Sequence, residues 1–139
     1  MVIAAGGLKG QDFSSTYEQA LEQWKRSRTR EEFVRTAERF RELQTHPQVG
    51  DMKANCLFWE GESWYGAGEY WRALVLFEKV LLYPNSHKEE DARYKVGMCY
   101  VRLGKKLEAK RELDLFLKVY PQSRHSPKVK DLLKRFSSP

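Results

Sequence analysis

The chain has 139 residues, which suits a single domain, and its 41% hydrophobic and 32% charged residues are those of a globular protein rather than a disordered one. Its 25 Lys and Arg residues outnumber its 19 Asp and Glu residues, so the net charge is +6. That charge favours acidic surfaces without defining a nucleic-acid partner. No apolar run has the length of a membrane span, so we expect a protein that does not cross a membrane.

The two cysteines, Cys56 and Cys99, have neither a CxxC partner nor a histidine at metal-binding spacing. They are predicted to be small buried thiols. We therefore expect no bound metal and no other cofactor.

The N-terminal part of the chain predicts a short lead segment followed by a pair of helices. Residues 1–14 are expected to be flexible, as a linker, a remnant of expression or the residue of a processed precursor. Ser15 with Glu18, and Thr29 with Glu32, have the spacing of capping boxes and predict helices over about 15–27 and 30–44. The second helix carries apolar residues at helical spacing before Pro47, namely Phe33, Ala37, Phe40 and Leu43.

The middle of the chain contains two copies of one pattern, over 54–84 and 91–121. Small and aromatic residues recur 36 positions apart: Gly61 and Gly97, Trp64 and Tyr100, Gly68 and Gly104, Ala73 and Ala109. Such a period indicates a solenoid, in which each unit is a helix pair that buries its apolar face against its neighbours. Phe40 and Pro47 precede Phe77 and Pro84 by 37 positions, which makes 15–47 a divergent first copy.

The predicted fold is therefore all-α, with one domain over 15–136. It comprises repeats over 15–47, 51–84 and 87–121, and a C-terminal capping helix over 126–136. The helices of the second and third repeats are expected over 51–67, 69–83, 88–103 and 105–120, with Ser86 and Glu89 as a third capping box. Pro84 comes one residue early, so the second helix of its repeat should be slightly shortened.

The last predicted helix begins at Ser126-Pro127 and carries a single apolar stripe, formed by Val129, Leu132, Leu133 and Phe136. One apolar and one basic face suit the end of a solenoid. The first helix of a further repeat, and a basic amphipathic helix lying on a membrane, are the alternatives.

The helix over 51–67 has two apolar stripes where an ordinary surface helix has one. Its second stripe and the equivalent stripe of the third repeat predict a partner-binding groove, lined by Asn55, Phe58, Trp59, Glu62, Tyr65, Tyr94, Lys95, Met98 and Arg102. Aromatic side chains would supply anchors and the charges would fix the register of a bound peptide or helix. The alternative is that these aromatics, above all Phe58 and Tyr94, belong to the core between repeats. Trp71 could mark a second interface or a homo-oligomer contact.

These residues resemble the tetratricopeptide repeat. Its pattern is filled by Gly61, Trp64, Ala73, Phe77 and Pro84 in one copy, and by Gly97, Tyr100, Ala109, Leu113 and Pro121 in the next. The resemblance implies a right-handed superhelical solenoid of about three helix pairs that binds another protein in a concave groove lined by the first helix of each pair.

A narrower resemblance rests on the phrases FEKVLLYPNS and LDLFLKVYPQS. They are similar to repeats of the TolA-binding, Tol-Pal coordinator family and of outer-membrane assembly lipoproteins of the BamD type. This resemblance implies an adaptor of the bacterial cell envelope or periplasm, with the cytoplasm as the alternative. The carboxylate clamp of chaperone-binding tetratricopeptide repeats is incomplete here.

Enzymatic function is not expected, and neither is a small-molecule substrate. His46, His87 and His125 stand at helix boundaries and are predicted to be surface turns without catalytic partners. Glu60 and Glu62, two residues apart, should point to different faces of their helix. The predicted function is thus a non-catalytic protein-interaction adaptor. The alternative is a repeat that binds RNA or an acidic polymer through the arginines of its first repeat, namely Arg26, Arg28, Arg30, Arg35, Arg39 and Arg41.

Overall fold

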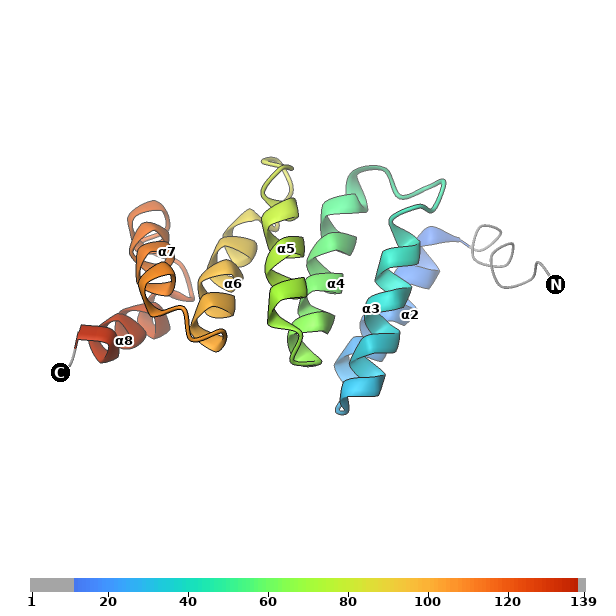
Figure 1. Ribbon diagram of the computed structural model, residues 1–139. Coiled ribbons are helices and arrows are strands. Elements are labelled where there is room, and N and C mark those ends of the chain that lie inside the picture. The colour runs from blue at the N-terminus through green and yellow to red at the C-terminus, as the bar shows by residue number, and fades with distance from the viewer. Residues whose placement is uncertain (1–11, 138–139) are drawn as a thin grey trace.

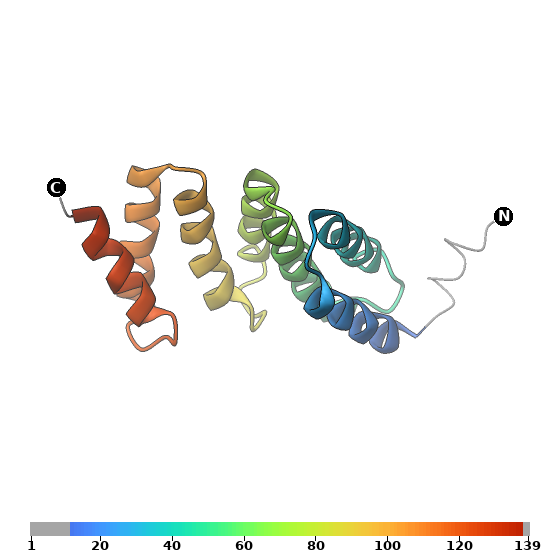
Figure 2. The same ribbon diagram turned by 90° about the horizontal axis from the view of Figure 1, so that it is seen from below.

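The computed structural model describes residues 12–137, and within that range it contains seven α-helices and no β-strand. The helices are α2 (Phe13–Arg26), α3 (Arg30–Leu43), α4 (Lys53–Gly66), α5 (Tyr70–Val80), α6 (Glu89–Arg102), α7 (Lys106–Val119) and α8 (Ser126–Ser137), with a 3-10 turn η1 (Gly50–Met52) before α4. They follow one another along an elongated array with α2 and α8 at opposite ends (Figures 1 and 2). The predicted all-α helical-repeat solenoid is confirmed. Nothing in the range described is both long and apolar enough to be a membrane-spanning helix.

Among helices α2 to α7, only α2 and α3 begin after a residue whose side chain caps the helix, and only one of the three predicted capping boxes is present. Thr29 caps α3 as predicted: its hydroxyl accepts a hydrogen bond from the Glu32 amide at 3.2 Å, and Glu32 accepts one from the Thr29 amide at 2.9 Å. The predicted start of α2 at Ser15 was wrong, because Asp12 is the cap and its carboxylate accepts from the Ser15 amide at 3.0 Å. Residues 12–14 therefore belong to the helical domain, and the rest of the predicted flexible segment lies outside the described residues.

The predicted box at Ser86 was also wrong. Helix α6 begins at Glu89 after Lys88, which makes no side-chain capping bond, and the Ser86 hydroxyl instead accepts from the Lys88 amide at 3.4 Å. The turn between α5 and α6 is thus held by its own short-range bond rather than by a reciprocal cap.

The recurring small residues are the places where helices of one pair cross. A Cβ atom added to Gly61 would lie 2.9 Å from Cε1 of Phe77, and one added to Gly97 would lie 2.6 Å from Cδ2 of Leu113. Both distances are shorter than carbon atoms tolerate. The glycines therefore let a large side chain of the second helix pack directly on the backbone of the first. As expected, α5 is shorter than α7, with 11 residues against 14.

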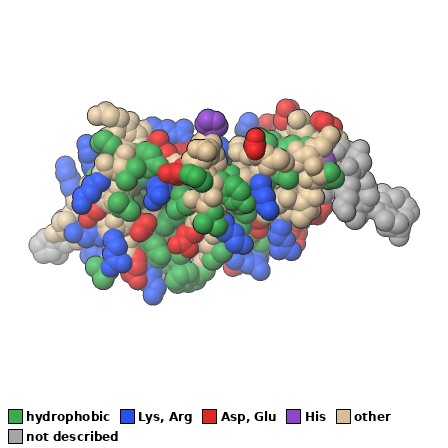
Figure 3. Space-filling view, turned by 90° about the horizontal axis from the view of Figure 1, so that it is seen from above, with side chains coloured by type: hydrophobic (Ala, Val, Ile, Leu, Met, Phe, Trp, Pro, Cys, Tyr) green, Lys and Arg blue, Asp and Glu red, His purple; other side chains and the backbone are tan. Residues whose placement is uncertain are grey.

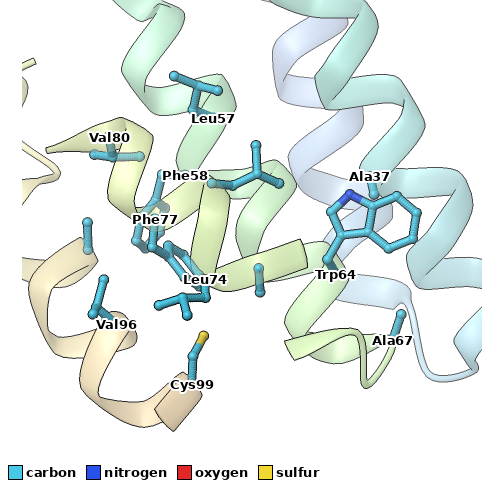
Figure 4. Packing of buried hydrophobic residues seen from close by; sticks show 13 residues of the cluster. Ala37, Leu57, Phe58, Trp64, Ala67, Leu74, Phe77, Val80, Val96 and Cys99 are labelled. Atoms are coloured by element: carbon cyan, nitrogen blue, oxygen red, sulfur yellow. The ribbon is translucent and has the colours of Figure 1, made fainter. Parts of the chain in front are cut away.

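The largest apolar cluster lies in the middle of the array and joins α3, α4, α5 and α6 (Figure 4). Phe77 and Val80 of α5 are fully buried between Leu57 of α4 and Val96 of α6. Cys99 lies in the same cluster, and burial raises the pKa of its thiol to about 12. Because the thiolate is the reactive form of cysteine, this thiol reacts slowly in the folded protein. The burial of both cysteines, predicted from the sequence, is confirmed.

Glu60 is buried within this region and is satisfied by two donors. Its carboxylate accepts from Trp64 Nε1 at 3.0 Å and from Gln44 Nε2 at 2.7 Å, which ties α4 to the end of α3. Glu62 instead pairs with Lys95 of α6 at 3.0 Å. The prediction that the two carboxylates point to different faces is confirmed.

Helix α8 packs on the end of the array through its apolar stripe. Val129 is fully buried beside Tyr94, Leu113 and Phe116, and the remaining stripe residues are half-buried against the same cluster. The Ser126 hydroxyl donates to the Tyr120 carbonyl oxygen at 3.0 Å and fixes the turn before the helix.

Candidate functional site

The first helices of successive pairs contact one another and form one continuous face of the array. Trp24 of α2 meets Trp59 of α4 with ring centroids 4.9 Å apart. Tyr94 of α6 stacks on His125, just before α8, with centroids 3.9 Å apart and planes inclined by 4°. Together with the Glu62–Lys95 pair, these contacts define what we call the inner face, formed by α2, α4, α6 and the start of α8.

A pocket of about 250 Å³ opens on the inner face between α4, α6 and the segment that enters α8. Its lining combines three aromatic rings with six ionisable groups: Phe58, Trp59, Tyr94, Glu62, Asp91, Lys88, Lys95, Arg124 and His125. Phe58 and Tyr94 are buried, so they form the floor, and the charged groups surround it. The pocket can take up a bulky side chain and still offer polar partners at its rim.

Both carboxylates of the pocket are already paired. Glu62 and Lys95 have side chains only 17% and 16% exposed. The Lys95 ammonium also lies 3.4 Å from the ring centroid of Tyr65. Asp91 accepts from His125 Nε2 at 2.8 Å and from Arg124 at 3.2 Å. Burial by itself would raise the pKa of Asp91, but the hydrogen bonds and charges of His125 and Arg124 outweigh it and lower that pKa below its ordinary value.

Lys88 differs from the other cations of the pocket. Its ammonium lies 5.0 Å and 5.2 Å from the ring centroids of Phe58 and Trp59, within cation–π range. Across residues 12–137, no carboxylate lies within ion-pair distance of it. A positive charge is thus held over the aromatic floor without a counter-ion.

The structure brings together five of the nine residues predicted to line a groove, namely Phe58, Trp59, Glu62, Tyr94 and Lys95. Trp59 is only half-buried, but its ring contacts Trp24, Phe40 and Phe58, so it also belongs to the core.

The other four predicted groove residues do not line this pocket. Met98 is 7% exposed and packs in the cluster around Leu113. Tyr65 accepts a hydrogen bond from Arg102 Nε at 3.2 Å, outside the pocket. Asn55 lines a separate cavity of about 680 Å³ between the loops before α4 and after α5.

Two histidines have surroundings that differ from those predicted. His125 was predicted to have no carboxylate around it, and its bond to Asp91 contradicts that prediction. His46 is 3% exposed, with Nδ1 accepting from the Gln48 amide at 3.0 Å, so it is not a surface turn. The one sequence feature that could have indicated a partner for His125 is its position directly before α8, because the start of that helix meets the inner face of the preceding repeat.

The arginines of the first repeat do not form a uniform basic patch. Arg26, Arg35 and Arg39 border a cleft of about 710 Å³ between α2 and α3, together with acidic residues Glu18, Glu22 and Glu32. Arg30 pairs with Glu69 at 2.7 Å. On the face seen in Figure 3, Lys and Arg side chains are spread among acidic and apolar ones.

No group of three His, Cys, Asp or Glu side chains among residues 12–137 could hold a metal ion. The inner face does provide an aromatic pocket with fixed charges.

The fold and this surface define a helical-repeat solenoid. Residues 91–123, which run from α6 to the turn after α7, match the family model of the tetratricopeptide repeat. No match was found among curated proteins. The chain is thus supported as a tetratricopeptide-type repeat protein, and such repeats generally mediate protein–protein interactions and are typically non-catalytic. The narrower resemblance to TolA-binding and BamD-type proteins is not confirmed.

Proposed function

We propose that this protein is a non-catalytic interaction module that binds a segment of a partner protein on its inner face, with the pocket between α4 and α6 as the anchor site. The observation that carries the proposal is Lys88, a cation above the rings of Phe58 and Trp59 for which residues 12–137 supply no counter-ion. A partner segment that places an apolar side chain on the floor and a carboxylate beside Lys88 would satisfy both features. Anchors of this kind contribute about 2 kcal/mol or more to a protein interface.

The arrangement of the other charges supports selectivity. Asp91 and Glu62 are held by Arg124, His125 and Lys95, so they stiffen the rim and leave Lys88 as the charge that a ligand can neutralise. Charged groups at the rim of a binding site fix the position of the bound segment and exclude wrong partners. We therefore expect the partner segment to carry an acidic residue next to its apolar anchor.

The test is a selection of displayed random peptides on the whole chain, followed by affinity measurements on individual peptides. We expect selected peptides to combine an apolar residue with a neighbouring Asp or Glu. Their affinity should fall about tenfold in Lys88→Glu, because that change replaces attraction by repulsion. The control is Lys79→Glu, at an exposed position of α5. It makes the same change of charge away from the pocket and should leave the affinity unchanged.

Two results would count against the proposal. One is a set of selected peptides whose binding is equal in Lys88→Glu and in the wild type, with both proteins folded by circular dichroism. The other is retention of RNA in a filter assay that weakens steeply with salt, since binding to a polyanion releases counterions whereas an apolar anchor hardly responds to salt.

A further inference from the structure

The opposite side of the array, formed by α5 and α7, carries exposed apolar residues that no helix of the described chain covers. Trp71 and Val75 of α5 are 55% and 50% exposed, and Leu115 and Val119 of α7 are 42% and 49% exposed. Each pair is spaced four residues apart, so each lies on one side of its helix. Exposed apolar groups gathered on neighbouring elements mark interaction surfaces.

Three carboxylates lie among these apolar residues. Glu78 is three residues after Val75, and Glu112 is three residues before Leu115, so both share the face of their apolar neighbours. Glu108 is one turn before Glu112. Across the described range, 12–137, none of the three has a cation within ion-pair distance.

The two helices present these groups on one surface. Lys105, directly before α7, places its ammonium 5.9 Å from the ring centroid of Trp71 in α5, so a side chain from the start of α7 reaches the start of α5. Burial and the charge of Glu112 raise the pKa of Glu78. Burial and the charges of Glu78, Glu112 and Glu108 raise the pKa of Tyr100, which therefore has all three carboxylates around it.

We propose that this outer face of α5 and α7 binds a basic amphipathic helix of a partner protein. The apolar stripe of that helix would cover Trp71, Val75 and Leu115, and its Lys or Arg residues would pair with Glu78, Glu108 and Glu112. Lys105 puts one positive charge at the Trp71 end of this face, whereas Glu78, Glu108 and Glu112 lie close enough to repel one another. A basic partner would remove that repulsion. This site is independent of the pocket on the inner face.

A second copy of the chain fits the same face less well. A two-fold dimer brings the same patch of both copies together, so it would place the carboxylates of one copy against those of the other. An anionic lipid surface is disfavoured for the same electrostatic reason.

The test uses a fluorescent synthetic helix of about 18 residues with a leucine stripe flanked by lysines, and a matched peptide with glutamates in place of the lysines. Binding to the whole chain is followed by anisotropy. We expect the lysine peptide to bind and the glutamate peptide not to bind. The double variant Glu78→Lys/Glu112→Lys should weaken the lysine peptide by about tenfold or more. Trp71→Ala, at a largely exposed position, should weaken it as well.

The control is Glu38→Lys/Glu42→Lys, which makes the same change of charge at two exposed positions of α3. It should leave the affinity of the lysine peptide unchanged. The proposal is overturned if the wild type does not bind that peptide, if both double variants weaken binding equally, or if Lys88→Glu on the inner face abolishes it. It is also overturned if light scattering shows a dimer that Trp71→Ala dissociates, because the occupant is then a second copy.

Discussion

The first helix pair and the two that follow occupy equivalent places in the array, yet different side chains join their helices. In the second and third pairs, Gly61 and Gly97 let Phe77 and Leu113 pack on the helix backbone. In the first pair no such glycine exists, and the helices meet through the hydroxyls of Ser27 and Thr36, which lie 3.1 Å apart, and through aromatic contacts around Phe40. The comparison teaches that a repeat fold limits the side-chain volume at a helix crossing more strictly than it limits the residue types found there.

The difference extends to stability within the array. The second pair lies at the centre of the largest apolar cluster and is covered on both sides, by α3 and by α6. The first pair has a neighbour on one side within the described residues, and a polar cleft separates part of its two helices. Because repeat arrays gain stability from nearest-neighbour contacts, opening should begin in α2 and α3.

Removing one buried ring from each region should show the largest effect. Phe77→Ala and Phe40→Ala each delete a fully buried phenylalanine, and each should lower the free energy of unfolding by about 4 kcal/mol. Denaturant melts measure the two losses. Hydrogen exchange should separate the variants, with protection lost across α4, α5 and α6 in Phe77→Ala but mainly in α2 and α3 in Phe40→Ala. Equal loss along the whole chain in both would show that the two regions do not differ in cooperativity.

Adding one methyl group at the glycine crossings tests whether close approach defines the later repeats. Gly61→Ala should cost about 2 kcal/mol, because the new Cβ meets the stiff ring of buried Phe77. Gly97→Ala should cost about 1 kcal/mol, because the atom it meets is the end of the Leu113 side chain, which can rotate. Thermal and urea melts give both values. A larger cost at Gly97, where the contact is shorter, would contradict the argument from ring stiffness.

The smallest effect concerns the caps. Thr29→Ala removes the capping-box acceptor at the start of α3 and should cost about 1 kcal/mol. Ser86→Ala, at the corresponding sequence pattern before α6, should change stability by less than about 0.5 kcal/mol, because that hydroxyl caps no helix amide. Equal costs in urea melts would mean that Ser86 stabilises the turn as strongly as a true cap does.

Much of the fold could be predicted because its signals are local or periodic. The helix positions follow from apolar spacing, and the crossings follow from Gly61, Ala73, Gly97 and Ala109. The start of α2 could not be predicted reliably, because Asp12 and Ser15 are both good capping residues three positions apart. The structure selects Asp12, and Phe13 is then buried against His46 at a centroid distance of 5.5 Å.

The candidate site was predictable only in part. The second stripe of α4 identified Phe58, Trp59 and Glu62, but the same helical spacing suits core and surface residues alike. Met98 therefore could not be recognised as a core residue. The bond between Asp91 and His125 joins residues 34 positions apart across a repeat boundary, and no local pattern encodes it.

The sequence by itself determined a helical repeat, the residues at which helices cross, and the presence of more apolar faces than one helix pair can bury. Tertiary structure decided which of these apolar faces pack against other helices and which remain exposed. It buried Met98 and closed a pocket around Phe58 and Tyr94. It left Lys88 without a counter-ion among residues 12–137, and it brought Glu112 close to Glu78 on the other side of the array. The physical reason is that helical period fixes the direction of a side chain relative to its own helix, whereas its burial depends on which neighbouring helix lies against it.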